Sequence, residues 1–133
     1  MKTFNPVRLA SLKEVKVFCH NHKIPSLSSG GCFVFAAALR ALLRRGTLWC
    51  VVTTSNSNHT DSVDHVVLRL ASKYADSKGI FTKKQLLDPY HKFGYKSRLE
   101  PLADTTEATL GDIWFEKTAV AELAGILRQA DAV

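Results

Sequence analysis

The stretch SLSSGGCFVFAAALRALLRRG, from Ser26 to Gly46, decides the fold. It begins as a polar loop that ends in Gly30 and Gly31, and from Cys32 onward it is apolar except for arginines near its end. Such a run predicts a buried helix over Cys32–Arg45, with Ser28 or Ser29 as its cap and Gly46 as its stop. The arginines suit the negative end of the helix dipole. The stretch therefore places a thiol in the first turn of the most buried helix.

The flanking segments predict a single α+β domain over residues 1–133. Helical spacing indicates one helix before this stretch, and β-branched and aromatic residues indicate strands after it. The predicted helices are Leu9–His22, Thr82–Tyr90 with Thr82 as cap, and Thr118–Ala132; the predicted strands are Thr47–Thr54, His65–Leu70, Lys73–Ser77 and Gly94–Leu102, with a polar loop over Ser55–Asp64. This order predicts a central N-terminal helix packed on a mainly antiparallel sheet.

Composition narrows the class of protein. The chain is 46% hydrophobic and 23% charged, which is ordinary for a globular domain. It has no apolar run of the roughly 18 residues that a membrane span needs, and its start does not look like a secretory signal. Three cysteines do not suit a secreted disulfide framework, so we expect a reducing, cytoplasmic compartment.

The net charge of +6 is unevenly distributed. Residues 1–50 hold eight Lys and Arg against one acidic residue, whereas residues 101–133 hold two against six. A basic half can attract acidic partners, including nucleic acid. The basic residues are scattered, however, without interleaved aromatic residues, and this is equally typical of a solvated basic face.

Cys32 is the candidate nucleophile. A thiolate is stabilised by the partial positive charge and free N–H groups of a helix N-terminus, and the same N–H groups can hold an oxyanion. The alternative is a buried structural cysteine, because free cysteines are often buried. Cys19, within a predicted helix, and Cys50, within a predicted strand, are interpreted as core residues.

His65 and Asp76 are the candidate base and orienting carboxylate. If the turn between their strands lies at Ala71-Ser72, the two residues are diagonal neighbours; if it lies at Leu70-Ala71, they are directly opposite. Both registers place them on one face of the sheet, whereas a three-residue loop without a bulge would separate them. The alternative is a histidine at a strand start and an exposed turn aspartate.

These residues resemble the papain-like cysteine peptidase superfamily, especially its transglutaminase-like and arylamine N-acetyltransferase-like branches. The order Cys32, His65, Asp76 matches, and the G-C-helix followed by HVVL and YADSKGIF segments resembles small phage and bacterial proteins. The resemblance covers about 28–81. It implies a papain-like fold without a cofactor or metal, and acyl transfer on a polypeptide substrate, with Cys32 attacking a carbonyl, His65 as base and then acid, and Asp76 orienting it. With water as the acceptor of the acyl group the enzyme would be a hydrolase, and with an amine it would be a transferase. A viral origin would place the protein in the host cytoplasm.

The resemblance leaves the oxyanion donors open, because the loop that runs from Pro25 to Cys32 lacks the glutamine that papain-type peptidases have before their cysteine. Gly31 and Asn21 are the candidates for oxyanion and substrate positioning. Trp49, His59 and Tyr74 are candidate residues of the site wall.

Two other classes of function compete with the enzyme. Structural zinc has little support, since Cys19, His20, His22, His59 and His65 lack ligand spacing, and no phosphate-loop pattern accompanies Gly30-Gly31. The main alternative is a small basic binding or inhibitor protein without catalysis, viral in type, acting on a host protein or nucleic acid. Oligomeric state does not follow from the sequence.

Overall fold

The computed structural model describes residues 4–28, 30–55, 57–92, 95–104 and 117–131, and within them the chain has the predicted α+β fold. Its sheet has five strands in the order β4-β3-β2-β1-β5, and every pairing is antiparallel. The elements in chain order are α1 (Pro6–Ala10), α2 (Lys13–Asn21), α3 (Cys32–Leu43), β1 (Thr47–Thr54), β2 (Asp61–Leu70), β3 (Lys73–Asp76), β4 (Gly79–Phe81), α4 (Lys83–Lys92), β5 (Lys96–Pro101), the 3-10 turn η1 (Leu102–Asp104) and α6 (Lys117–Asp131).

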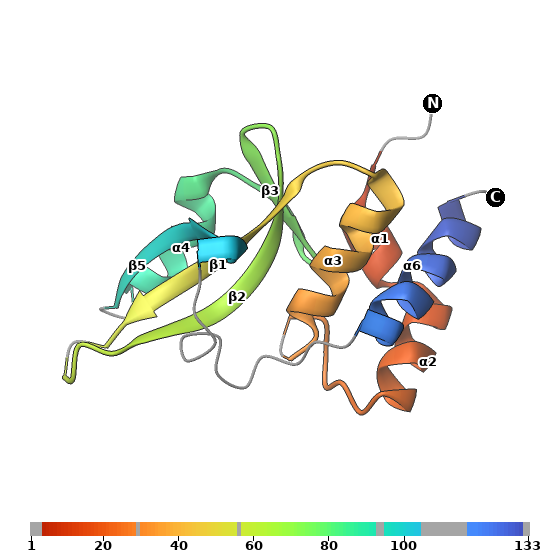
Figure 1. The fold of residues 1–133 in the computed structure, drawn as a ribbon, viewed down its shortest axis with the longest axis horizontal. Helices are drawn as coiled ribbons and strands as arrows, with labels where there is room; N and C mark the ends of the chain where they lie inside the picture. The colour runs from red at the N-terminus through yellow and green to blue at the C-terminus, as the bar shows by residue number, and fades with distance from the viewer. Residues whose placement is uncertain (1–3, 29, 56, 93–94, 105–116, 132–133) are drawn as a thin grey trace.

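The two faces of the sheet carry separate apolar cores. Side chains alternate along each strand, so Cys50, Val66 and Leu68 share one face, and this face packs with α1, α2, α3 and α6. Val51 and Val67 lie on the other face with the apolar side of α4. Figure 1 shows α1, α2, α3 and α6 gathered at one side of the molecule and the sheet with α4 at the other.

α3 is the central helix of the larger core. All residues from Cys32 to Leu39 are buried, because the sheet and α6 both pack against this helix. The helix ends at Leu43, and Arg44 takes the left-handed conformation that follows many helices. Its N-cap is Gly31, with no side-chain hydrogen bond, so the predicted cap at Ser28 is wrong; Ser29 lies outside the described residues.

The helix predicted over Leu9–His22 is in fact two helices. α1 begins at Pro6, and its cap is Asn5, whose side chain accepts a hydrogen bond from the Arg8 N–H. It ends because the Ser11 hydroxyl donates to the Val7 carbonyl and Leu12 is extended. The apolar stripe continues across this break, and so the sequence pattern did not reveal it.

The other elements follow the prediction, apart from shifted ends and one strand that was not predicted. β2 starts at Asp61, inside the predicted polar loop, because Asp61–Val63 pair with the end of β1. The three-residue strand β4 was missed, since so short a segment has no periodicity. β5 occupies Lys96–Pro101 of the predicted strand, α6 starts one residue earlier than predicted, and Gly94 and Ala132 lie outside the described residues. Thr82 caps α4 as predicted, with reciprocal hydrogen bonds to Gln85.

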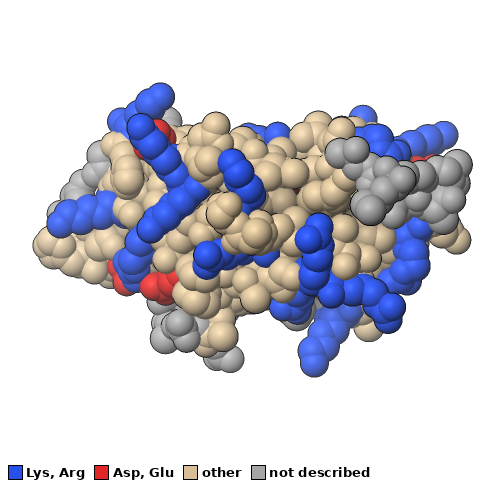
Figure 2. All heavy atoms as spheres, turned by 90° about the horizontal axis from the view of Figure 1, so that it is seen from above, with Lys and Arg blue, Asp and Glu red and all other residues tan. Residues whose placement is uncertain are grey.

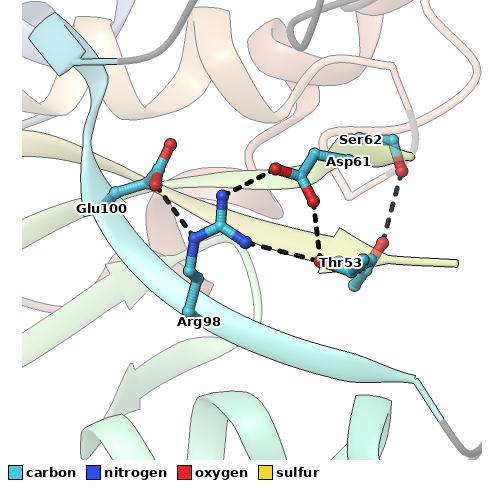
Figure 3. A network of polar contacts seen from close by, with 6 residues as sticks. Thr53, Asp61, Ser62, Arg98 and Glu100 are labelled. Atoms are coloured by element: carbon cyan, nitrogen blue, oxygen red, sulfur yellow. Dashed lines mark hydrogen bonds and ion pairs between the residues drawn. The ribbon is translucent and has the colours of Figure 1, made fainter. Parts of the chain in front are cut away.

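A polar network joins β1, β2 and β5 next to the β1–β2 hairpin loop (Figure 3). Arg98 of β5 forms ion pairs with Asp61 of β2 at 2.9 Å and with Glu100 at 3.0 Å. Asp61 also accepts a hydrogen bond from Thr54 of β1. The network links β5 to β2 across β1, which lies between them in the sheet.

Candidate active site

Cys32 is the first residue of α3, and its side chain faces β2. The residue is 5% exposed. Its sulfur accepts backbone hydrogen bonds from Phe33, in the first turn of α3, and from Val66 of β2. The thiol is thus held between a helix N-terminus and a strand, among N–H groups that favour its anion.

β2 is irregular beside His65. Val51 of β1 pairs with His65, but Val52 pairs with Val63, so Asp64 is an extra residue in β2. This bulge leaves Val63 in the core under α3 while His65 keeps the face of Val51 and Val67. Bulges of this kind commonly re-aim a side chain at a functional site.

Asp76 ends β3 and binds the imidazole. Its Oδ2 lies 2.8 Å from Nε2 of His65, and both side chains are about nine-tenths buried. Its Oδ1 accepts a hydrogen bond of 2.7 Å from the Lys78 N–H in the following turn. Both oxygens of the carboxylate are therefore held in place. Because Nε2 of His65 contacts Asp76, Nδ1 is the ring nitrogen that can exchange a proton with Cys32.

The electrostatics of the three groups favour a thiolate beside an imidazolium. Burial opposes ionisation of Cys32, but its hydrogen bond with His65, the charge of that ring and the backbone donors outweigh burial and lower the pKa of the thiol. Burial likewise opposes charge on His65, yet Asp76 and Cys32 raise its pKa to about 9. Each group thus stabilises the charged form of the other.

A pocket of about 250 Å³ opens at His65 and Asp76. Helix α4 forms one wall of the pocket and contributes Gln85, Leu86, Pro89 and Tyr90. The rest of the lining includes Ser28, Asp64, Lys78 and Phe81. Burial, together with the charges of Asp64, Cys32 and Asp76, raises the pKa of Tyr90 to about 12, so its phenol is a neutral hydroxyl near the site.

The predicted oxyanion residues lie in different places. The Gly31 N–H donates to the Ser26 carbonyl, so this amide is already occupied. Gly31 instead serves packing, since a Cβ there would lie 2.7 Å from Ile24 Cγ2. Asn21 lies on α2 in a hollow with Glu122, outside the pocket at His65.

The predicted wall residues do not line this pocket either. Trp49 and Tyr74 pack edge to face with centroids 6.3 Å apart, and the Arg69 guanidinium lies 4.9 Å above Trp49. Both rings belong to the apolar core under α4. His59 lies in the β1–β2 hairpin loop, where its N–H donates to Ser55. The sequence does not predict that α4 lines the pocket at His65, because no local pattern tells which helix will cover a strand.

The remaining candidates are placed as follows. Cys50 is fully buried, and Cys19 is half-buried with a pKa raised by burial. Among the described residues there is no cluster of three potential metal ligands. None of the helices in the described part of the chain has the length and apolarity to cross a membrane. Figure 2 shows Lys and Arg side chains spread along one face, with few acidic residues among them.

Comparison of the chain with protein-family models, with curated proteins and with solved structures gives no match.

Proposed function

We propose that the chain is a cysteine-dependent acyl-transfer enzyme of papain-like, transglutaminase-like type, acting on a polypeptide. The observation that carries the proposal is the buried contact of 2.8 Å between His65 and Asp76 beside a thiol whose pKa His65 lowers. A nucleophile, a base and an orienting carboxylate in this relation are what acyl transfer requires.

The chemistry proceeds in two halves. The Cys32 thiolate adds to the substrate carbonyl, and the resulting oxyanion is held by donors at the start of α3, where we assign the Cys32 N–H because Gly31 is already bonded. The C–N or C–S bond then breaks, the leaving group takes the proton of His65, and a thioester forms on Cys32. His65 next removes a proton from water or an amine, which attacks the thioester and releases the thiolate. Asp76 keeps the ring oriented throughout.

Three cysteines in one chain make the test internally controlled. Cys19 is the more exposed thiol but has a raised pKa, whereas Cys32 is 5% exposed with a lowered pKa. We would treat the folded protein with limiting iodoacetamide from pH 5.5 to 9 and map each site by mass spectrometry. Thiolate character predicts that Cys32 reacts about tenfold or more faster than Cys19 at pH 6.5. His65→Ala should raise the apparent pKa of Cys32 and cancel this advantage. Preferential labelling of Cys19, with Cys32 inert, contradicts the proposal.

The competing function, an anion-binding protein without catalysis, is favoured by a different hollow. It has a volume of about 460 Å³ at the end of α3, and its charged lining is Arg40, Arg44, Arg45 and Lys117, without an acidic residue among the described ones. If this function is correct, a fluorescent single-stranded oligonucleotide binds with strong salt dependence. That binding is lost in Arg44→Glu/Arg45→Glu and survives Cys32→Ala.

A further inference from the structure

A second hollow lies next to the candidate active site. It has a volume of about 500 Å³ and lies between α1, α2, the loop before α3 and the turn after β3. Ser28 and Lys78 line both this hollow and the pocket at His65, so the two are neighbours that share part of their wall. Lys78 also donates its N–H to Asp76, which places the junction directly beside the proposed catalytic carboxylate.

The charges of this second hollow have one sign. Its ionisable side chains, apart from the Cys19 thiol, are Lys16, His20 and Lys78, and no acidic residue lines it. In the described part of the chain no ion pair joins Lys16, His20 or Lys78 to an acid. Serine hydroxyls and the apolar residues Ile24 and Leu27 complete the wall. The opposite side of α2 differs, since Lys13 there shares its hollow with Glu14 and Glu122.

We infer that this hollow binds a carboxylate of the polypeptide substrate, an acidic side chain or a chain terminus next to the reacting carbonyl. The inference rests on the proposed acyl-transfer function. Its volume falls in the range of roughly 300–1,000 Å³ typical of ligand pockets. Unpaired ammonium groups with neighbouring hydroxyls form charge-assisted hydrogen bonds to a carboxylate. The acyl group then lies at His65, and the acidic group lies beyond Ser28 and Lys78.

The test uses chloroacetyl dipeptides, which alkylate a thiolate and carry a variable second residue. The probes are chloroacetyl-Gly-Glu-amide, its Gln and Lys counterparts, and chloroacetyl-Gly-Gln with a free C-terminal carboxylate. The second-order rate of Cys32 modification is measured by mass spectrometry, with peptide mapping to separate Cys19. We expect the Glu probe to react about tenfold faster than the Gln probe at low ionic strength, with the Lys probe slowest. At 0.5 M salt the ratio should fall to about twofold.

Matched variants on α2 separate the hollow from general charge. Lys16→Gln should bring the Glu and Gln rates closer together, whereas Lys13→Gln, which also removes one lysine but on the other side of the helix, should leave their ratio unchanged. The free-acid probe tells a chain terminus from an acidic side chain. Equal Glu and Gln rates in the wild type, or equal effects of the two variants, overturn the inference. If Cys32 reacts with iodoacetamide as proposed but shows no acidic preference, only this inference fails; if Cys32 is inert to every reagent, the proposed function fails too.

Discussion

Nε2 of His65 lies 2.8 Å from Oδ2 of Asp76, although the two residues are diagonal rather than opposite in the β2–β3 pair. Leu70 pairs with Lys73 and Leu68 with Ala75, so Val67 is the residue that this register sets against Asp76. Diagonal side chains are roughly 7–8 Å apart at their origins, and an imidazole and a carboxylate together span that separation.

Replacing Asp76 with asparagine tests the role of this contact. The amide can still accept the Lys78 N–H but carries no charge to stabilise the imidazolium. The pKa of His65 should therefore fall, the pKa of Cys32 should rise, and Cys32 alkylation at pH 6.5 should slow about tenfold. Asp64→Asn is the control, because Asp64 lines the same pocket but is hydrogen-bonded to Thr53. Equal slowing in both variants would show that pocket charge, rather than the contact, sets the reactivity.

Stability should depend on pH through His65. Its pKa is raised from 6.5 to about 9 in the folded state, so the folded state binds this proton more tightly than the unfolded chain. The resulting stabilisation is complete below pH 6.5 and is lost as the pH rises through about 9. In a Cys32→Ser background, where no thiolate titrates with the opposite sign, the protein should lose unfolding free energy relative to Cys32→Ser/His65→Gln between these limits, at about 1.4 kcal/mol for each unit by which Asp76 raises the pKa of His65. Urea denaturation at pH 6 and 9.5 measures it. A difference between the two proteins that stays constant with pH argues against the raised pKa.

Gly31 should be intolerant of any side chain. A Cβ there would lie 2.7 Å from Ile24 Cγ2 and 2.9 Å from the Ser26 carbonyl oxygen, and backbone cannot yield as a side chain can. Gly31→Ala should cost about 1–3 kcal/mol and slow Cys32 alkylation by displacing the start of α3. Gly125→Ala in α6 is the matched control, because nothing lies within 4 Å of its added Cβ. It should stabilise the protein by about 0.5–1 kcal/mol. Thermal denaturation compares the two variants, and a neutral Gly31→Ala would refute the packing argument.

Arg98 should contribute little to stability despite its two ion pairs. Its side chain is 47% exposed, and exposed ion pairs contribute roughly 0.2–1 kcal/mol each. Arg98→Ala should therefore lower the unfolding free energy by less than about 1 kcal/mol, and 0.5 M salt should shrink the difference. Chemical denaturation at both salt concentrations measures it. A larger loss that persists in high salt would instead indicate that Arg98 acts through packing of β5.

Sequence patterning was sufficient for most of the individual elements of the chain. Three of the signals are local, because each depends on residues close together in the chain. They are the apolar run after Gly31, the alternation from His65 to Leu70 and the capping box of Thr82 and Gln85. These local signals do not predict the break between α1 and α2 at Ser11-Leu12, nor the strand β4. One is a side-chain hydrogen bond inside a continuous apolar stripe, and the other is a strand too short for a period.

The sequence by itself determined that Cys32 opens a buried helix, and for a two-residue turn it placed His65 and Asp76 on one face of a hairpin, since helix starts and strand alternation follow from local sterics and apolar spacing. The register of β2 with β3 in the structure settled which turn is present. Only the tertiary structure decided that Asp64 bulges out of β2, that the Val66 N–H meets the thiol, that Gly31 is already bonded and that α4 rather than Trp49 and Tyr74 forms the pocket wall. These relations join residues far apart in the chain. They depend on how whole elements pack over the two faces of the sheet, and no local pattern encodes that packing.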